Sequence, residues 1–308
     1  MSIHEQMEAM PDRHVEGNNE AGEQALVQIE YFTDPLCSWS WAFEVQWRRL
    51  RYECAERLNW RYRMGGLIAD WRSYDDPLND IRSPSQMGPQ WFQVYEMSGM
   101  PLDDHLWQID PPASSYPACI AVKAAERQGP TAIEEYLRRL REAVMMERRN
   151  IARRDILLAV AQETAATGLL DLDRFCADLD AAEPMDSFRQ DLRDAAYYGI
   201  GRFPTLILHR YDERGIVLIG YRPYDALRSA IEHLVPGITQ QTSSMSSQEL
   251  TVAYVTRWRR VVARELMEVL DYDNLDQVQA MLQSLVANGT LLLADDTPSD
   301  EPIYMSRS

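Results

Sequence analysis

The chain has 308 residues, of which 45% are hydrophobic and 26% charged, a composition typical of a folded globular protein rather than a disordered one. Its 48 acidic and 31 basic residues give a net charge of −17, which disfavours binding to nucleic acid phosphates. No stretch reaches the roughly 18 to 20 apolar residues that span a bilayer, so we expect neither a nucleic acid partner nor a membrane.

The N-terminal segment, residues 1–24, is polar and acidic. It has no apolar core that could serve as a signal peptide. We therefore expect a disordered tail on a protein that is localised in the cytoplasm.

A strand–helix–strand unit follows the tail. Residues 25–32 form a short apolar run with β-branched residues, which predicts a buried strand. An amphipathic pattern predicts one helix from Cys37 to about Leu58, and the alternating residues 59–64 predict a second strand that Gly65 ends. This order is that of a βαβ unit.

The middle of the chain, about residues 84–199, is predicted to be mostly helical. Gly99, Gly129 and Gly168 follow the last periodic residues of three segments, as helix C-caps do. Asp171 is expected to begin a further helix.

Strand signals return after this block, at 203–208 and 215–220, and a closing helix is predicted at 223–234. The whole forms one α/β domain that spans about 25–235, with the helical block as an insertion.

The C-terminal part is predicted to be a separate small unit. Residues 236–248 read as a polar linker, and 249–294 as two or three helices followed by a strand. That order is similar to a winged helix-turn-helix remnant, but we favour a small helical packing or interaction module, because the segment 271–283 that would read DNA is acidic. Residues 295–308 are expected to be a flexible tail.

The informative segment is DPLCSWSW, in which Cys37 lies where a strand ends and a helix begins. A helix N-terminus carries free N–H groups and partial positive charge, which favour the thiolate that acts as nucleophile. The alternative is that Cys37 is a small buried apolar residue. Cys54, Cys119 and Cys176 are scattered, and no spacing is typical of a disulfide framework or a metal site.

DPLCSWSW followed by a helix resembles the CxxC region of the DsbA-like thioredoxin-fold family, especially its cytoplasmic branch near FrnE-type oxidoreductases and ClpXP adaptors. In this sequence Ser40 replaces the second cysteine, which gives a CxxS motif. GIGRFPTLIL (199–208) is a second match, because such folds place a cis-proline opposite the active-site cysteine, and Pro204 is the candidate. The resemblance implies a thioredoxin fold with an all-helical insertion over about 25–235 and leaves the C-terminal module outside it. The candidate site residues are Cys37 as catalytic thiol, supported by Ser38, Trp39, Ser40, Phe203 and Pro204.

A serine cannot resolve a mixed disulfide, so the motif predicts monothiol chemistry at Cys37. Cys54 is 17 residues further along the predicted helix and too distant to bridge. Cys119 and Cys176 are expected to be core residues. We therefore favour a cytoplasmic thiol-disulfide oxidoreductase or isomerase acting on a protein disulfide or a glutathione mixed disulfide. No cofactor is expected to be bound, and glutathione is the candidate co-substrate.

Two other functions remain open. In the first, the chain is a non-enzymatic adaptor with a DsbA-like body, and 249–294 contacts a protein partner. In the second, it is a glutathione-dependent transferase or isomerase of the kappa-class type. That branch uses serine at the thiol position, so Cys37 makes it less favoured.

Overall fold

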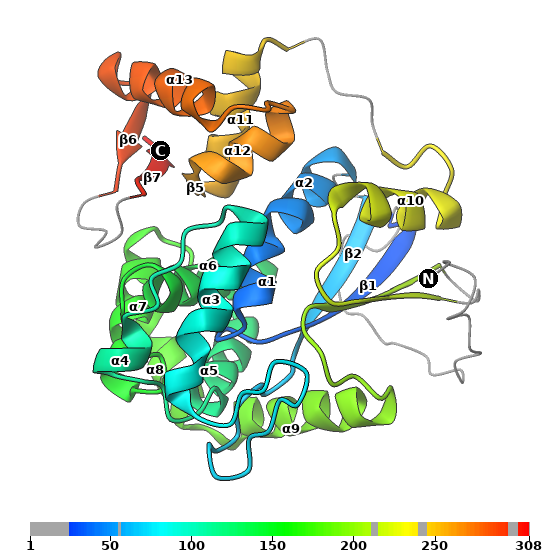
Figure 1. Cartoon of the computed structure of the whole chain (residues 1–308), viewed down its shortest axis with the longest axis vertical. Coiled ribbons are helices and arrows are strands. Elements are labelled where there is room, and N and C mark those ends of the chain that lie inside the picture. Colours follow the sequence, from blue (N-terminus) through cyan, green and yellow to red (C-terminus); the bar gives the residue numbers. More distant parts are fainter. Residues whose placement is uncertain (1–24, 55–56, 211–214, 240–244, 295–300, 308) are drawn as a thin grey trace.

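The structure is a computed structural model that describes residues 25–54, 57–210, 215–239, 245–294 and 301–307. It has a larger body with a four-stranded sheet and a C-terminal module with a three-stranded sheet (Figure 1). The tail expected at 1–24 lies outside the described residues. Among the described residues, no helix combines the length and apolar character that a membrane span requires.

The body is built on a mixed sheet in the order β2-β1-β3-β4. β1 pairs with β2 in parallel and with β3 antiparallel, and β4 pairs antiparallel with β3. The parallel pair confirms the predicted βαβ unit. The strands are β1 (Val27–Thr33), β2 (Leu58–Met64), β3 (Thr205–His209) and β4 (Ile216–Ile219).

The central strand β1 is covered on both faces, and six of its seven residues are buried, including the polar Glu30 and Thr33. Tyr31 packs against Phe43 and Trp47 on one side, with ring centroids 5.9 and 5.2 Å away. The next residue, Phe32, points to the other side and contacts Tyr198. Figure 1 shows the helices α2 (Glu44–Cys54) and α10 (Tyr224–Leu234) on one side of the sheet and α9 (Ala182–Tyr197) on the other.

The helix after β1 differs from the prediction. It is interrupted at Phe43, which separates α1 (Ser38–Ala42) from α2, and α2 ends at Cys54 instead of continuing to Leu58. Leu58 cannot extend the helix because it already pairs with Val27 in the parallel ladder.

The predicted helical insertion is present. Gly99 (φ 67°) ends one of its helices, and Asp171 caps another by accepting a bond from the Arg174 amide. Gly129 was expected to end a helix, but it precedes the first residue of the next one. The elements are η3 (Pro84–Gln86), α3 (Met87–Ser98), α4 (Leu106–Ile109), α5 (Tyr116–Glu126), α6 (Pro130–Met145), α7 (Arg154–Ala166), α8 (Leu172–Asp180) and α9.

The C-terminal module has the order helix, strand, helix, helix, strand, strand, which is the order of a winged helix. The predicted helices followed by a strand are present, and residues 260–262 and 303–306 are two strands that the prediction lacked. The complete order fits the winged-helix alternative better than a small helical packing module. The flexible tail predicted for 295–308 is wrong for residues 303–306, because they form the central strand of the module's sheet, in the order β5-β7-β6. The elements are α11 (Ser247–Trp258), β5 (Arg260–Val262), α12 (Ala263–Leu270), α13 (Leu275–Ala287), β6 (Leu291–Leu293) and β7 (Ile303–Ser306).

Candidate functional site

Cys37 lies at the N-cap of α1, opposite the loop that leads into β3. Its Sγ is 3.5 Å from the backbone oxygen of Phe203 and donates a hydrogen bond to it. The Phe203–Pro204 peptide bond is cis, as predicted, and Pro204 is buried. The fold therefore brings together the cysteine and the proline, which are far apart in the sequence.

The thiol is buried, and only 5% of Cys37 is exposed. Burial raises the pKa of the Cys37 thiol; the nearby carboxyl of Asp34 also raises it, and Ser40 and Arg141 oppose these effects only in part. The expectation that the helix terminus lowers this pKa is wrong. The loss of solvent around the sulfur outweighs the hydrogen bonds with Ser40 that favour the thiolate.

Asp34 is a buried residue of the site that the sequence analysis did not identify. Its carboxylate accepts hydrogen bonds from the amides of Leu36 (2.8 Å) and Leu67 (2.7 Å), from the hydroxyl of Ser115 (2.8 Å) and from the thiol of Cys119 (3.2 Å). Burial still raises the pKa of Asp34 despite these donors. Asp34 thus joins the end of β1 to the loop after β2 and to the start of α5, close to Cys37.

The predicted supporting residues have different environments. Ser38 and Ser40 are buried. Trp39 is half-buried, with its ring 5.8 Å from that of Tyr221. Phe203 was expected to border a groove, but its ring packs so tightly across Gly65 that a Cβ there would lie 1.9 Å from Cζ. Packing therefore accounts for the position of the Phe203 ring.

The other cysteines do not pair with Cys37, and all four are free. Cys54 and Cys119 are buried and Cys176 is half-buried. One small cluster, formed by Asp103, Asp104 and His105, brings three possible ligand atoms within 4.8 Å of one another. Asp103 already binds Arg148 at 2.7 Å and His105 at 2.8 Å, and no other observation indicates an ion there.

A second feature of the site is the interface between the body and the C-terminal module. Its centre is Glu265 of α12, which is completely buried. The Glu265 carboxylate accepts a bond from Arg48 of α2 (2.9 Å) and bonds from Arg138 of α6 (2.9 and 3.2 Å). The amide of Val262 is a further donor at 2.9 Å. Two guanidinium groups of the body therefore hold one carboxylate of the module.

The same arginines connect this interface to the thiol helix. The Arg138 guanidinium lies 4.5 Å from the ring centroid of Trp41 in α1, and Arg48 is 3.3 Å from Glu44. Glu44 also pairs with Arg141, one of the groups that act on the Cys37 pKa. A continuous set of buried charges thus runs from the module to the vicinity of Cys37.

Other arginines complete the interface. Arg260 pairs with Glu142 at 2.6 Å, Arg259 pairs with Glu135 at 3.1 Å, and Arg264 donates to the backbone oxygen of Ser98 at 2.8 Å. On the other side, the guanidinium groups of Arg48 and Arg51 lie 5.0 and 4.7 Å from the ring centroid of Trp258. Charged contacts from both units therefore fix the module on α2 and α6 (Figure 1).

Comparison with known proteins identifies the family of the body. The model of the thioredoxin family matches residues 31–229. The chain belongs to the thioredoxin family. Its fold, a thioredoxin fold with a helical insertion, is of the DsbA-like kind.

Relatives of two kinds are similar to this chain. The ClpXP adapter protein SpxH of Halalkalibacterium halodurans is 29% identical over 269 residues, which cover 87% of this chain and 85% of the relative. The cytosolic disulfide reductase DsbM of Pseudomonas aeruginosa has a TM-score of 0.53 at 24% identity and covers 67% of this chain and 97% of its own. A candidate protein disulfide isomerase of Nitrosomonas europaea has a TM-score of 0.57 at 23% identity, with 68% and 97% covered. The two solved structures show the fold alone.

The coverage separates the two kinds of relative. The SpxH alignment is longer than the 235 residues that precede the predicted linker, so it extends into the C-terminal part of the chain. The DsbM alignment accounts for nearly all of that protein and leaves about a third of this chain unmatched. The adapter relative therefore shares more of this chain than the reductase does.

Proposed function

We propose that this protein is a cytoplasmic adaptor that presents client proteins to a ClpXP-type protease, with its thioredoxin-fold body and its C-terminal module acting as one scaffold. The observation that carries the proposal is the buried contact of Glu265 with Arg48 and Arg138, which joins the module to the body. A scaffold of this kind offers a composite surface from both units to a protein partner. The similarity to SpxH, which extends into the C-terminal part of the chain, supports the same function.

The state of the thiol also favours a scaffold over an oxidoreductase. A thiolate is the nucleophile in disulfide exchange, and a raised pKa leaves less thiolate at neutral pH. Cys37 is buried, its pKa is raised, and Ser40 cannot act as a resolving thiol. Each of these features slows exchange, and none of them impairs protein binding.

The test is a degradation assay with purified ClpXP from the host. Candidate clients are the proteins whose half-lives lengthen when the gene for this chain is deleted. We expect the full-length protein to accelerate the degradation of at least one client several-fold, and the Cys37→Ala variant to act equally well. If the full-length protein changes no degradation rate, the adaptor function is rejected.

A second function, monothiol exchange, is favoured by the position of Cys37 beside the cis-proline. The Cys37 thiolate would attack a glutathione mixed disulfide, form a new S–S bond and release the substrate as a thiolate that takes up a proton. Glutathione would then attack this bond, leaving glutathione disulfide and the free Cys37 thiolate. The test is deglutathionylation of a peptide in the presence of glutathione, and activity that survives Cys37→Ala rejects this function.

A further inference from the structure

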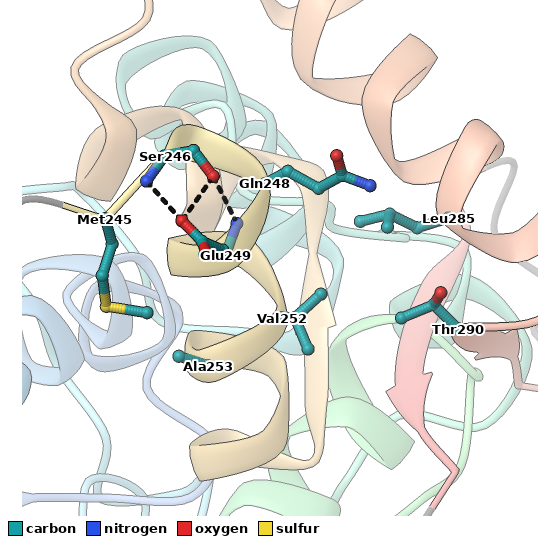
Figure 2. A pocket seen from close by; sticks show the side chains of 8 residues that line it. All are labelled: Met245, Ser246, Gln248, Glu249, Val252, Ala253, Leu285 and Thr290. Carbon is teal, nitrogen blue, oxygen red and sulfur yellow. Dashed lines mark hydrogen bonds between the residues drawn. The ribbon is translucent and has the colours of Figure 1, made fainter.

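The C-terminal module has a hollow of about 620 Å³ on its surface, between α11 and the end of α13 (Figure 2). Val252 and Ala253 of α11 and Leu285 of α13 give it an apolar lining. Figure 2 shows Val252, Leu285 and Thr290 converging across the hollow from two sides. The hollow is open to solvent, so a short segment of a partner has direct access to it.

The rim of the hollow carries a fixed negative charge. The Glu249 carboxylate accepts hydrogen bonds from the amide (2.8 Å) and the hydroxyl (2.7 Å) of Ser246, as part of the capping box of α11. These bonds lower the pKa of Glu249, so its carboxylate is ionised at neutral pH. Met245, whose side chain is 41% exposed, extends the apolar surface next to this charge.

The C-terminal module contains more acidic than basic residues. Residues 246–307 contain ten acidic residues and five arginines. Three of the arginines, Arg259, Arg260 and Arg264, contact the body and are not available to a partner. Exposed carboxylates without an ion pair among the described residues include those of Asp271, Asp273 and Asp276, but these are at the start of α13, whereas the hollow is at its end. The exposed Arg307 lies beside Gly289, next to Thr290. The negative charge at the hollow is therefore that of Glu249.

We propose that this hollow binds a basic, amphipathic segment of the client, with an apolar side chain against Val252 and Leu285 and a lysine or arginine beside Glu249. The inference rests on the proposed adaptor function and names the chemistry of its client. The Glu249 carboxylate at the rim and the net charge of −17 favour a cationic client segment. A second copy of this chain carries the same net charge of −17 and is repelled, as nucleic acid is. The openness of the hollow suits a short client segment rather than a broad folded surface of the unfoldase.

The first experiment measures peptide binding to the full-length protein by fluorescence anisotropy. The probe is a short amphipathic peptide of leucine, alanine and lysine, and its counterpart carries glutamate in place of lysine. We expect the lysine peptide alone to bind, and Ala253→Arg to weaken its binding at least about tenfold. Gln283→Arg, which adds the same charge on an exposed position of α13 outside the hollow, should leave the affinity within about twofold. Equal binding of both peptides, or an unchanged affinity in Ala253→Arg, overturns the inference.

A second variant tests the rim charge with a smaller change, which is less disruptive to folding than a new arginine. Glu249→Gln keeps an oxygen for the Ser246 donors and changes only the charge at the rim. We expect it to melt like the wild type and to weaken the lysine peptide about threefold or more at low salt. If its affinity is unchanged, the rim charge does not contact the ligand and the inference fails.

The degradation assay separates this inference from the proposed function. We expect Ala253→Arg to raise the KM for the client and to leave the rate at saturating client unchanged. If the rate falls equally at all client concentrations, the hollow contacts the unfoldase and the inference is overturned. If the variant delivers clients as well as the wild type does, the inference fails while the adaptor function stands. If the wild type itself delivers no client, the proposed function is the part that fails.

Discussion

Substitution of Glu265 by glutamine tests how strongly the C-terminal module is held. The Glu265 carboxylate is inaccessible to solvent and faces two guanidinium groups, so the amide removes a charge and leaves Arg48 and Arg138 buried without it. Removing one partner of a buried ion pair costs about 3 to 5 kcal/mol. Here Arg48 keeps Glu44 at 3.3 Å and Arg138 keeps Glu142 at 2.8 Å. We therefore expect a loss at the low end, about 3 kcal/mol.

The assay is urea denaturation of the full-length protein, followed by tryptophan fluorescence and by protease cleavage between the body and the module. Trp258 lies against Arg48 and Arg51 in the interface, so release of the module changes its emission. Glu268→Gln is the matched control. Glu268 is on the same helix and pairs with Arg49 and Arg264, but its side chain is 22% exposed, so the expected loss is below about 1 kcal/mol. If both variants lose the same stability, the buried carboxylate does not hold the module.

Three further predictions concern the site and the interface. Alkylation of Cys37 by iodoacetamide should have its pH midpoint above the ordinary thiol pKa of 9.0, because burial raises this pKa; a midpoint below 8.5 contradicts the assignment. Burial opposes ionisation of Glu142, but Arg260 and other guanidinium groups hold its pKa at about 2, below the ordinary 4.5. The ionised Glu142 therefore contributes on the order of 3 kcal/mol to the free energy of unfolding above pH 4.5, and this contribution is lost as the pH falls toward 2. Melting temperatures measured across this pH range test the prediction, and a melting temperature that does not change with pH would contradict it. Gly65→Ala should destabilise the fold by about 1 to 3 kcal/mol, because its Cβ meets the Phe203 ring, and the loss should shrink in a Phe203→Ala background. Thermal melts of the single and double variants decide this, and additive losses would contradict it.

The features that the sequence predicted correctly depend on local patterns. Each body strand lies within two residues of its predicted run, because apolar or alternating runs of this length are typical of strands. The cis bond at Pro204 followed from the resemblance of GIGRFPTLIL to the family motif. Asp171 caps a helix as its side chain suggests.

The features that the sequence did not predict depend on distant contacts. Arg48 and Arg138 are buried, and Glu265, a partner of both, belongs to α12, which is more than a hundred residues away in the sequence. Burial and the nearby Asp34 raise the pKa of Cys37. The position of Cys37 at the start of a helix, which the sequence does show, predicts neither of these effects. The short strand Ile303–Ser306 is stabilised by hydrogen bonds to β5 on one side and to β6 on the other, and both of these strands come earlier in the chain.

The position of β7 in the middle of its sheet determines where this chain can be shortened. β5 and β6 have no hydrogen bonds with each other, and each pairs with β7. A protein cut after residue 294 would keep three helices of the module and lose the strand that connects their two short β partners. Ile303 is also completely buried, in the same apolar core as the body. Removing the last few residues should therefore destabilise the sheet of the module and also remove an apolar contact that holds the module on the body.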